Sequence, residues 1–532
     1  MRAACVCRSP ALPSARGHVP PPRTRHTSSC NHFIVSSPRV AAAAEPPLLP
    51  GATPFRLAVK DNITAAGFPT QCASRILHQY APDYEATIVR QLRVRGARVV
   101  GKTNMDEFGM GSHSFNSIHG PVRSPISLAP DQPPLSAGGS SGGSAVAVML
   151  DDADVALGTD TGGSVRLPAS YTGAVGYRPS YGMLSRFGVV PYANSLDTVG
   201  MIAREVQPIR ELIAGHKTIP ALDQVHDSLD PTSLSMASRR RCADACPPAL
   251  DDNTQLTIGI PLEYNILELE SVIRDTWAEA GAILERAGIR IVPVSLPTTR
   301  QALCAYYVIA AAEASSNLAK FDGVRYGLRT SRGDATGETL YSNTRGSGFG
   351  DEVRRRILLG TYSLSAAGIN NYFLQAQRVR RLVRRDLNRV FRRANPLCEP
   401  RQFDLCDMVE ATEVQDRRGP VQVDFLLTPT SPKLPVPVQQ VQGSSSVESY
   451  FTDVFTVPAS LAGLPAISLP VRAVGSRLPV GLQLVGQFWD DRRLLALAER
   501  VKPLLGWQWE DMIEQGLIDA SLMRRWETDA QE

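Results

Sequence analysis

The sequence predicts an α/β fold, because strand and helix patterns alternate along much of its 532 residues. Residues 55–60 (FRLAVK) form an apolar run typical of a buried strand, and residues 85–95 have apolar side chains at helical spacing. A second strand pattern, 97–104, follows the stop at Gly96. Residues 257–264, 272–288 and 289–297 repeat the order of strand, helix and strand, which is typical of parallel α/β units.

The other elements are consistent with one large domain over residues 46–515 and a C-terminal tail at 516–532. Residues 205–215, 302–318 and 351–394 have helical periodicity, and the last two belong to a helical insertion at about 300–395. A polar, arginine- and proline-containing segment predicts a surface excursion over about 205–255. Buried strand patterns follow at 424–432 and within 455–487.

Charge is unevenly distributed between the N-terminus and the rest of the chain. The net charge is +4, but residues 1–44 hold six arginines and no acidic residue, which leaves the remainder at −2. A nearly neutral body carries no basic face of the size that a nucleic acid requires. The arginine- and serine-rich segment 1–45, whose first acidic residue is Glu45, predicts a disordered transit peptide, with an untargeted disordered tail as the alternative.

Membrane spans and metal sites are not expected. No apolar run approaches the roughly 18–20 residues that a spanning helix needs. Cys242 and Cys246 form a lone CxxxC pattern without the second ligand pair that a zinc site requires. The cysteines are expected to be free thiols in a reducing compartment.

Residues 138–144 (GGSSGGS) combine glycines and serines in a way that suggests nucleophilic chemistry. The first five match the G-x-S-x-G pattern of a nucleophile elbow, which requires a strand directly before it. Three prolines and no strand pattern precede it here, and only two histidines follow residue 140, both in the polar excursion. A Ser-His-Asp hydrolase is therefore disfavoured.

A serine nucleophile without histidine needs another base, and Lys60 is the candidate. A lysine accepts a proton only when burial keeps it neutral, and Lys60 ends an apolar strand. Residue spacing alone favours the more common alternative, a lysine that reaches out to water. Gly162 and Gly163, before Ser164, either form an oxyanion hole or serve only as a tight loop, and the local pattern does not decide between these.

Three motifs together resemble the amidase signature family. They are VKDNI around Lys60, GGSSGGS at 138–144 and GTDTGGSVRLPA at 158–169, and the 24 residues between Ser140 and Ser164 agree with that family. The resemblance implies a large, twisted, mixed β-sheet covered by helices on both faces. It also implies Ser164 as the nucleophile, Ser140 as a proton relay that follows a cis peptide bond, and Lys60 as the base.

Further residue roles follow from the same resemblance. The backbone amides of Thr161, Gly162 and Gly163, with that of the nucleophile, would form the oxyanion hole. Asp160 and Arg166 are expected to be structural partners and not reactants.

Residues 305–327, 348–365 and 450–470 resemble the glutamine-dependent members of the family. By position, Arg356 corresponds to a residue that binds the α-carboxylate, Asp453 to one that binds the α-ammonium group, and Tyr306 to a pocket tyrosine. The alignment could slip by one residue, to Arg355 or Tyr307. Each position also has an ordinary alternative: a solvated arginine, a helix N-cap and a core tyrosine.

The resemblance implies an enzyme: the glutaminase subunit of a mitochondrial amidotransferase that converts Glu-tRNA(Gln) to Gln-tRNA(Gln). B-type and C-type subunits would be its partners, ATP and Mg²⁺ would be used by the partner subunit, and this chain would need no cofactor of its own. The alternatives are a stand-alone amidase acting on small or fatty amides and a catalytically inactive scaffold. The intact Lys60, Ser140 and Ser164 argue against the scaffold.

Overall fold

The computed structural model describes residues 30–36, 47–126, 133–216, 218–225, 227–247, 249–250, 254–331, 337, 339–398 and 422–518. Over these ranges eleven strands form one mixed sheet in the order β1-β3-β2-β4-β6-β5-β10-β11-β9-β7-β8. The strands are β1 Phe33–Ser36, β2 Phe55–Lys60, β3 Ala97–Thr103, β4 Val155–Asp160, β5 Val175–Arg178, β6 Thr198–Ala203, β7 Thr257–Pro261, β8 Arg290–Val294, β9 Phe425–Pro429, β10 Ala466–Val471 and β11 Val480–Val485.

Both predicted strand–helix–strand units are present, which confirms the α/β class. β2 pairs in parallel with β3 and β4, and β7 pairs in parallel with β8 and β9. The central pairs β4–β6, β5–β6, β5–β10, β10–β11 and β11–β9 are antiparallel, so the sheet is mixed. The helices are α1 Thr87–Arg93, α2 Gly142–Met149, α3 Arg166–Thr172, α4 Val206–Ala214, α5 Met236–Asp244, α6 Ser271–Arg286, α7 Ala302–Asn317, α8 Ser342–Gly348, α9 Asp351–Leu364, α10 Phe373–Val390, α11 Val438–Gly443, α12 Ser446–Phe451, α13 Val457–Ala462, α14 Asp491–Val501 and α15 Trp509–Glu514.

Helices cover both faces of the sheet because successive strand side chains point to opposite faces. In β2, Leu57 and Val59 join a large apolar cluster with residues of α1 and α4, whereas Ala58 joins a second cluster with residues of α2 and α3. Lys60 has the parity of Ala58, so its side chain points to the face that α2 and α3 cover.

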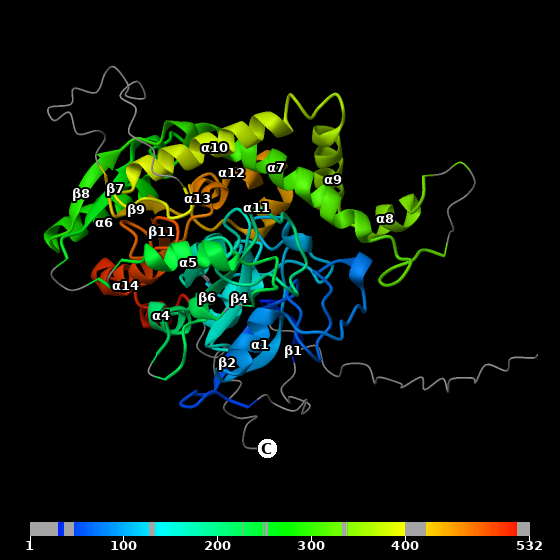
Figure 1. Ribbon diagram of the computed structural model, residues 1–532, viewed down its shortest axis with the longest axis horizontal. Helices are drawn as coiled ribbons and strands as arrows, with labels where there is room; N and C mark the ends of the chain where they lie inside the picture. Colours follow the sequence, from blue (N-terminus) through cyan, green and yellow to red (C-terminus); the bar gives the residue numbers. More distant parts are fainter. Residues whose placement is uncertain are drawn as a thin grey trace, which may run out of the picture.

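The predicted helical insertion contains α7, α8, α9 and α10, so the helical pattern at 351–394 is divided between two helices. α9 and α10 are separate, because the chain turns between residues 365 and 372. In Figure 1 α10 and α7 lie side by side along the top of the view, and α9 leads away from them toward α8. Within the described residues no helix is long and apolar enough to cross a membrane.

Three predicted boundaries need correction. Phe33–Ser36 forms an edge strand on β3, so the prediction that all of 1–45 is disordered and outside the fold is wrong for these residues. Leu517 and Ile518 are buried, so the domain extends past the predicted end at 515. The predicted surface excursion begins with α4, whose apolar face packs on α14 and the sheet. Residues 1–29, 37–46 and 519–532 lie outside the described ranges.

Candidate active site

The carboxyl ends of β3, β2 and β4 meet at one edge of the sheet, because these three strands are parallel. Lys60 ends β2, Asp160 ends β4, and Ser164 follows β4 by four residues. In open α/β sheets the loops after such strand ends form the ligand site. The topology therefore brings the predicted base and the predicted nucleophile to one edge.

Lys60 is completely buried, with no exposed surface (0%), so it does not reach out to water. Its Nζ lies 2.7 Å from Ser140 Oγ, 2.8 Å from Ser141 Oγ and 3.0 Å from Thr159 Oγ1. Burial lowers the pKa of Lys60 to about 7, although the charges of nearby acids oppose this shift. Near neutral pH a large fraction of the amine is therefore uncharged and able to accept a proton from a hydroxyl.

The GGSSGGS segment is a tight turn into α2, and its first serine follows a cis Gly139–Ser140 peptide bond. Its glycines allow close backbone contact: a Cβ on Gly143 would lie 2.4 Å from the Asn104 carbonyl oxygen. The Ser141 amide donates a hydrogen bond of 3.1 Å to the Ser164 carbonyl. This bond connects the two serine motifs through their backbones.

The loop from Thr161 to Ser164 is fixed from both sides. Thr161 Oγ1 donates to Asp197 Oδ1 at 2.7 Å, and Thr456 Oγ1, next to α13, donates to the Gly162 carbonyl at 2.6 Å. Gly163 has φ +150°, and a Cβ there would lie 2.3 Å from Thr456 Oγ1. Glycine is thus required at this position for both conformation and space, and the loop amides are preorganised.

Asp160, Arg166 and Arg178 form a buried ionic network behind this loop. Arg166 contacts both carboxylate oxygens of Asp160, at 2.9 and 3.0 Å, and Arg178 contacts Oδ1 at 3.0 Å. Burial opposes ionisation of Asp160, but the two guanidinium charges outweigh it and hold its pKa well below the usual range. Asp160 and Arg166 are paired with each other, and nothing in their contacts makes either a reactant.

Arg356 on α9 is buried against aromatic rings. Its Nε donates to Glu352 Oε1 at 2.7 Å and a terminal nitrogen donates to Tyr192 Oη at 2.5 Å. The guanidinium carbon lies 5.2 Å from the Tyr307 ring centroid and 5.1 Å from that of Tyr450. Such a rigid, weakly hydrated cation is suited to binding a carboxylate.

Asp453 lies between two hydroxyl donors. Tyr307 Oη donates to its Oδ2 at 2.8 Å and Ser112 Oγ donates to the same atom at 3.1 Å. Burial raises the pKa of Asp453 to about 7, because those donors and the charge of Arg356 offset only part of the desolvation. A cationic ligand would favour the ionised form.

The sequence of this chain carries the pattern of a known protein family over most of its length. The protein-family model described as Amidase matches residues 53–495, which is most of the chain. The chain belongs to the amidase family. It is therefore an enzyme of the amidase type, and the sheet with helices on both faces is the fold of that family.

Named relatives of this amidase agree on one subtype. The A-type subunit of mitochondrial glutamyl-tRNA(Gln) amidotransferase from Fusarium vanettenii is 64% identical over 474 residues, covering 89% of this chain and 91% of that protein. Its counterpart in Podospora anserina is 59% identical over 460 residues, covering 84% and 89%. The crystal structure of the A-type glutamyl-tRNA(Gln) amidotransferase subunit from Thermotoga maritima superposes with a TM-score of 0.64 at 34% identity, covering 88% of this chain and 86% of that one.

The structure distinguishes the residue pairs that the alignment left ambiguous. Tyr307 contacts Asp453, whereas the Tyr306 ring packs against Gly162, where a Cβ would lie 2.5 Å from the Tyr306 Oη. Arg355 is partly exposed and pairs with Glu352, whereas Arg356 is buried. Arg356, Tyr307 and Asp453 therefore lie together, and Tyr306 packs against the loop before Ser164.

Several residues of this site were not predicted from the sequence. Asp453 is contacted by Ser112, and Arg356 is contacted by Glu352 and Tyr192. Thr456 holds the loop before Ser164. The only sequence signal was the glycine- and serine-containing segment 109–117, a few residues after the strand pattern at 97–104. The other residues come from distant parts of the chain, so no local pattern connects them.

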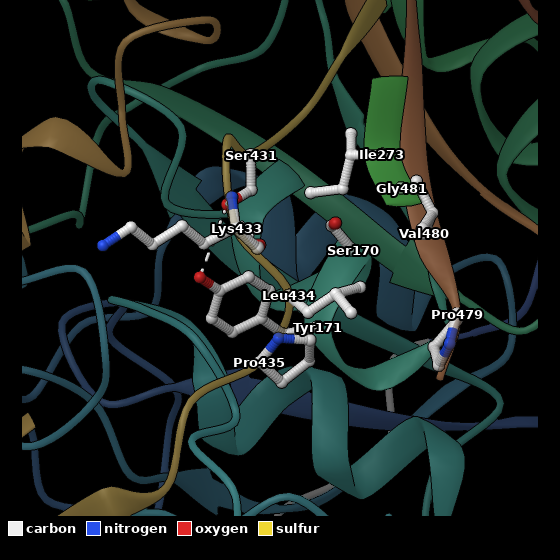
Figure 2. A pocket seen from close by; sticks show the side chains of 10 residues that line it. All are labelled: Ser170, Tyr171, Ile273, Ser431, Lys433, Leu434, Pro435, Pro479, Val480 and Gly481. Atoms are coloured by element: carbon white, nitrogen blue, oxygen red, sulfur yellow. Dashed lines mark hydrogen bonds between the residues drawn. The ribbon is translucent and has the colours of Figure 1, made fainter. Parts of the chain in front are cut away.

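A separate hollow of this amidase lies away from the predicted triad. Figure 2 shows it between α3, the start of β11 and the segment that follows β9, and the Tyr171 and Ser431 hydroxyls lie 3.4 Å apart at its wall. Neither Lys60, Ser140 nor Ser164 lines it. The hollow is therefore not where the predicted chemistry would occur. It is lined by Ser170, Tyr171, Ile273, Ser431, Lys433, Leu434, Pro435, Pro479, Val480 and Gly481.

Proposed function

We propose that this chain is the glutaminase subunit of a glutamyl-tRNA(Gln) amidotransferase, releasing ammonia from glutamine for the conversion of Glu-tRNA(Gln) to Gln-tRNA(Gln). The observation that carries the proposal is the buried contact of 2.7 Å between Lys60 Nζ and Ser140 Oγ. It joins a base whose pKa is lowered to about 7 to the turn that is hydrogen-bonded to the Ser164 backbone. Relatives up to 64% identical carry the name of this mitochondrial subunit, and this chain is a mitochondrial protein.

In the proposed mechanism neutral Lys60 accepts the proton of Ser140, and Ser140 accepts that of Ser164. The Ser164 oxygen then attacks the side-chain amide carbonyl of glutamine. The amides of residues 161–164 stabilise the developing oxyanion, and one such donor contributes about 3–4 kcal/mol in comparable sites. The proton held by Lys60 then returns through Ser140 to the amide nitrogen, which leaves as ammonia. Water hydrolyses the γ-glutamyl ester to glutamate and restores the Ser164 hydroxyl.

Recognition of free glutamine requires one fixed cation and one fixed anion. We assign the α-carboxylate to Arg356 and the α-ammonium group to Asp453, with Tyr307 orienting Asp453. Both charged groups are buried. A purely apolar amide is disfavoured, because it would offer no cation to Asp453 and no acceptor to the Arg356 N–H groups that Glu352 and Tyr192 do not engage. A stand-alone hydrolase of fatty amides is therefore the weaker alternative.

The partners proposed for this chain are B-type and C-type subunits. The relatives are named as one subunit of an amidotransferase, which implies a complex of several chains. ATP and Mg²⁺ would serve the amidation step in the partner subunit, and Glu-tRNA(Gln) would be held by the complex. The nearly neutral charge of residues 45–532 agrees with a chain that does not bind the tRNA by itself.

The test is an ammonia-release assay on the complex purified from mitochondria. The wild-type complex should release ammonia from glutamine, and Ser164→Ala should lower that rate at least about 10³-fold. Asp490→Asn, which alters a buried carboxylate outside the proposed site, is the matched control and should retain the rate. Unchanged release by Ser164→Ala would refute the nucleophile, and turnover of fatty amides without glutamine turnover would favour the alternative.

A further inference from the structure

Residues 106–116, directly after β3, lie between the predicted proton relay and the predicted ammonium site. The buried Asp106 carboxylate organises this segment. Its Oδ2 accepts the Ser114 amide at 2.8 Å, and its Oδ1 accepts the Phe115 and Asn116 amides at 2.8 and 2.9 Å. Three charge-assisted bonds fix the backbone of the segment on one side chain.

Asp106 also packs directly against the turn that carries Ser140. A Cβ on Gly139 would lie 2.4 Å from Asp106 Oδ2, so the carboxylate fills the space where a side chain would be. The Asp106 amide donates to the Ser140 carbonyl at 3.3 Å. On the other side of the turn, Ser114 Oγ accepts the Gly142 amide at 2.9 Å. The serine turn is thus held at two points by groups that Asp106 positions.

The same segment reaches the predicted substrate site through Ser112. Ser112 Oγ donates to Asp453 Oδ2 at 3.1 Å. The next residue, His113, lies with Nδ1 3.0 Å from Ser136 Oγ, which in turn accepts the Gly138 amide at 3.1 Å. Burial lowers the pKa of His113 to about 4, so its ring stays neutral near pH 7.

We infer that Asp106 is a positioning residue that couples two parts of this active site. It fixes the proton-relay turn around Ser140 and, through Ser112, the Asp453 carboxylate, while its negative charge acts on Lys60. The inference rests on the proposed function, because it assigns a common support to the glutaminase base and to the ammonium site.

The charged and titratable groups that act on Lys60 come from four segments. Asp106 has the largest opposing effect on its pKa, followed by Asp160 at the end of β4, Asp197 before β6 and Cys72 after β2. All four act to raise the pKa of Lys60 against the effect of burial. Removing the Asp106 charge therefore lowers that pKa further, and the acid limb of the activity profile moves to lower pH.

The test compares Asp106→Asn with wild type in the assembled complex, using glutamine and glutaramate, which lacks the α-ammonium group. We expect kcat/KM for glutamine to fall at least about tenfold, because an amide nitrogen cannot accept the Ser114 N–H. The fall should be at least about threefold smaller for glutaramate, which does not use Asp453. The acid limb measured with glutaramate should move down by about half a pH unit or more.

Two further variants separate charge from fit. Asp106→Glu keeps the charge, but its side chain is too long for the space beside Gly139. Turnover should therefore fall, while the acid limb of the pH profile stays at the wild-type pH. Ser112→Ala should raise KM for glutamine without changing KM for glutaramate, and this small truncation keeps the test valid if Asp106→Asn fails to fold.

Asp491→Asn is the matched control. Asp491 is equally buried, accepts three hydrogen bonds from Ser180 and Tyr177, and has its pKa raised by burial to about 6, as Asp106 does. Asp491→Asn should lower stability but leave unchanged both the pH of the acid limb and the ratio of kcat/KM for glutamine to kcat/KM for glutaramate.

The inference would be overturned if folded Asp106→Asn kept both the acid limb and the ratio of kcat/KM for glutamine to that for glutaramate. An unchanged KM for glutamine in Ser112→Ala would also overturn it. Wild-type turnover of glutaramate without turnover of glutamine would instead refute the proposed function. The acid limb measured on glutaramate would still decide the role of Asp106.

Discussion

At the scale of single residues, two buried lysines on neighbouring strands show how partners determine function. Val59 is in register with Lys102, so Lys60 and Lys102 lie close along the sheet edge. Lys102 Nζ lies 3.6 Å from Asp61 Oδ1 and donates to the Pro69 carbonyl and to the Thr70 hydroxyl, both at 3.1 Å. Lys60 contacts the hydroxyls of the serine turn, Ser140 and Ser141, instead of a carboxylate, so of these two lysines it is Lys60 that is suited to a proton relay.

The pH dependence of glutamine hydrolysis should report two groups. Burial lowers the pKa of Lys60 to about 7 and raises that of Asp453 to about 7. Below pH 7 the base becomes protonated and inactive, and Asp453 loses the charge that binds the substrate ammonium group. We expect kcat/KM for glutamine to fall with a slope approaching 2 on a logarithmic plot, and for glutaramate with a slope of about 1.

Steady-state rates between pH 5.5 and 9 in the assembled complex would measure the acid limb for both substrates. Equal slopes for the two substrates would contradict the assignment of Asp453. An acid limb near the ordinary lysine pKa would contradict the assignment of Lys60.

The two adjacent serines that contact Lys60 should differ in importance. Ser140→Ala removes the proposed proton bridge and should lower kcat at least about 10³-fold. Ser141→Ala removes only one contact of 2.8 Å to Lys60, so we expect a loss of about tenfold. Ammonia release measured on both variants would test this ranking of the two serines. A greater loss in Ser141→Ala than in Ser140→Ala would assign the proton bridge to Ser141 instead.

Lys60, Ser140 and Ser164 were predicted as a set only through the resemblance of three motifs to the amidase signature family, because residue types and spacing alone left the base and the role of the glycine loop open. The burial of Lys60 was not predictable, because the pattern of its strand alone favoured exposure. The choice between Tyr306 and Tyr307 also needed the structure, since consecutive helical positions point in different directions. Asp106 and Ser112 were missed because their importance lies in contacts with distant segments.

At the scale of elements, the loop between β4 and α3 depends on α13 and on the Asp160 network. Arg166, the first residue of α3, donates to the Thr456 carbonyl at 2.9 Å, and Thr456 Oγ1 donates to the Gly162 carbonyl. The sequence predicted the glycine loop, as an oxyanion hole or a tight turn, but not the strand β4 that precedes it. The clamp from residue 456 could not be predicted, because about 290 residues separate its partners.

Substituting Thr456 should affect turnover more than binding. Thr456→Val has almost the same shape but cannot donate to Gly162, so the oxyanion loop loses one anchor. We expect kcat for glutamine to fall about tenfold with little change in KM, whereas Thr456→Ser should retain most of the activity. Paired steady-state kinetics would measure this, and equal losses in both variants would mean that the hydroxyl is not the relevant group.

At the scale of the whole molecule, the N-terminal segment supports the active-site edge of the sheet. The His32 carbonyl accepts the Asn104 amide at 2.8 Å, and His32 Nε2 lies 2.6 Å from Asp152 Oδ2. A Cβ on Gly143 would lie 2.6 Å from the His32 carbonyl oxygen, so this segment directly backs α2. The charge pattern predicted a leader over 1–45 but gave no indication of the short edge strand within it.

Two shortened chains would locate the functional N-terminus. We propose that the arginine-rich, acid-free leader is a transit peptide whose removal leaves Cys30–Ser36 in place. A chain that begins at residue 30 should keep the full thermal stability. A chain that begins at residue 46 loses β1 and should melt about 3 °C lower or more. Equal melting temperatures would show that β1 adds nothing, and a folded chain sequenced from mitochondria beginning after residue 36 would contradict the proposed boundary.

The α/β class, the two parallel units and most strand positions were predictable, because local apolar patterns determine them. The order of the eleven strands was not, since it depends on pairings between β5 and β10 and between β7 and β9 that are far apart in the chain.

The central claim is that Lys60 and Ser140 activate Ser164 toward the side-chain amide of glutamine. The most direct test is to quench the complex with acid during glutamine turnover and map the γ-glutamyl ester by mass spectrometry. We predict an ester on the peptide that contains Ser164, and its loss in Lys60→Ala. Ammonia release with an ester on another residue, or a Ser164 ester that persists in Lys60→Ala, would contradict the account.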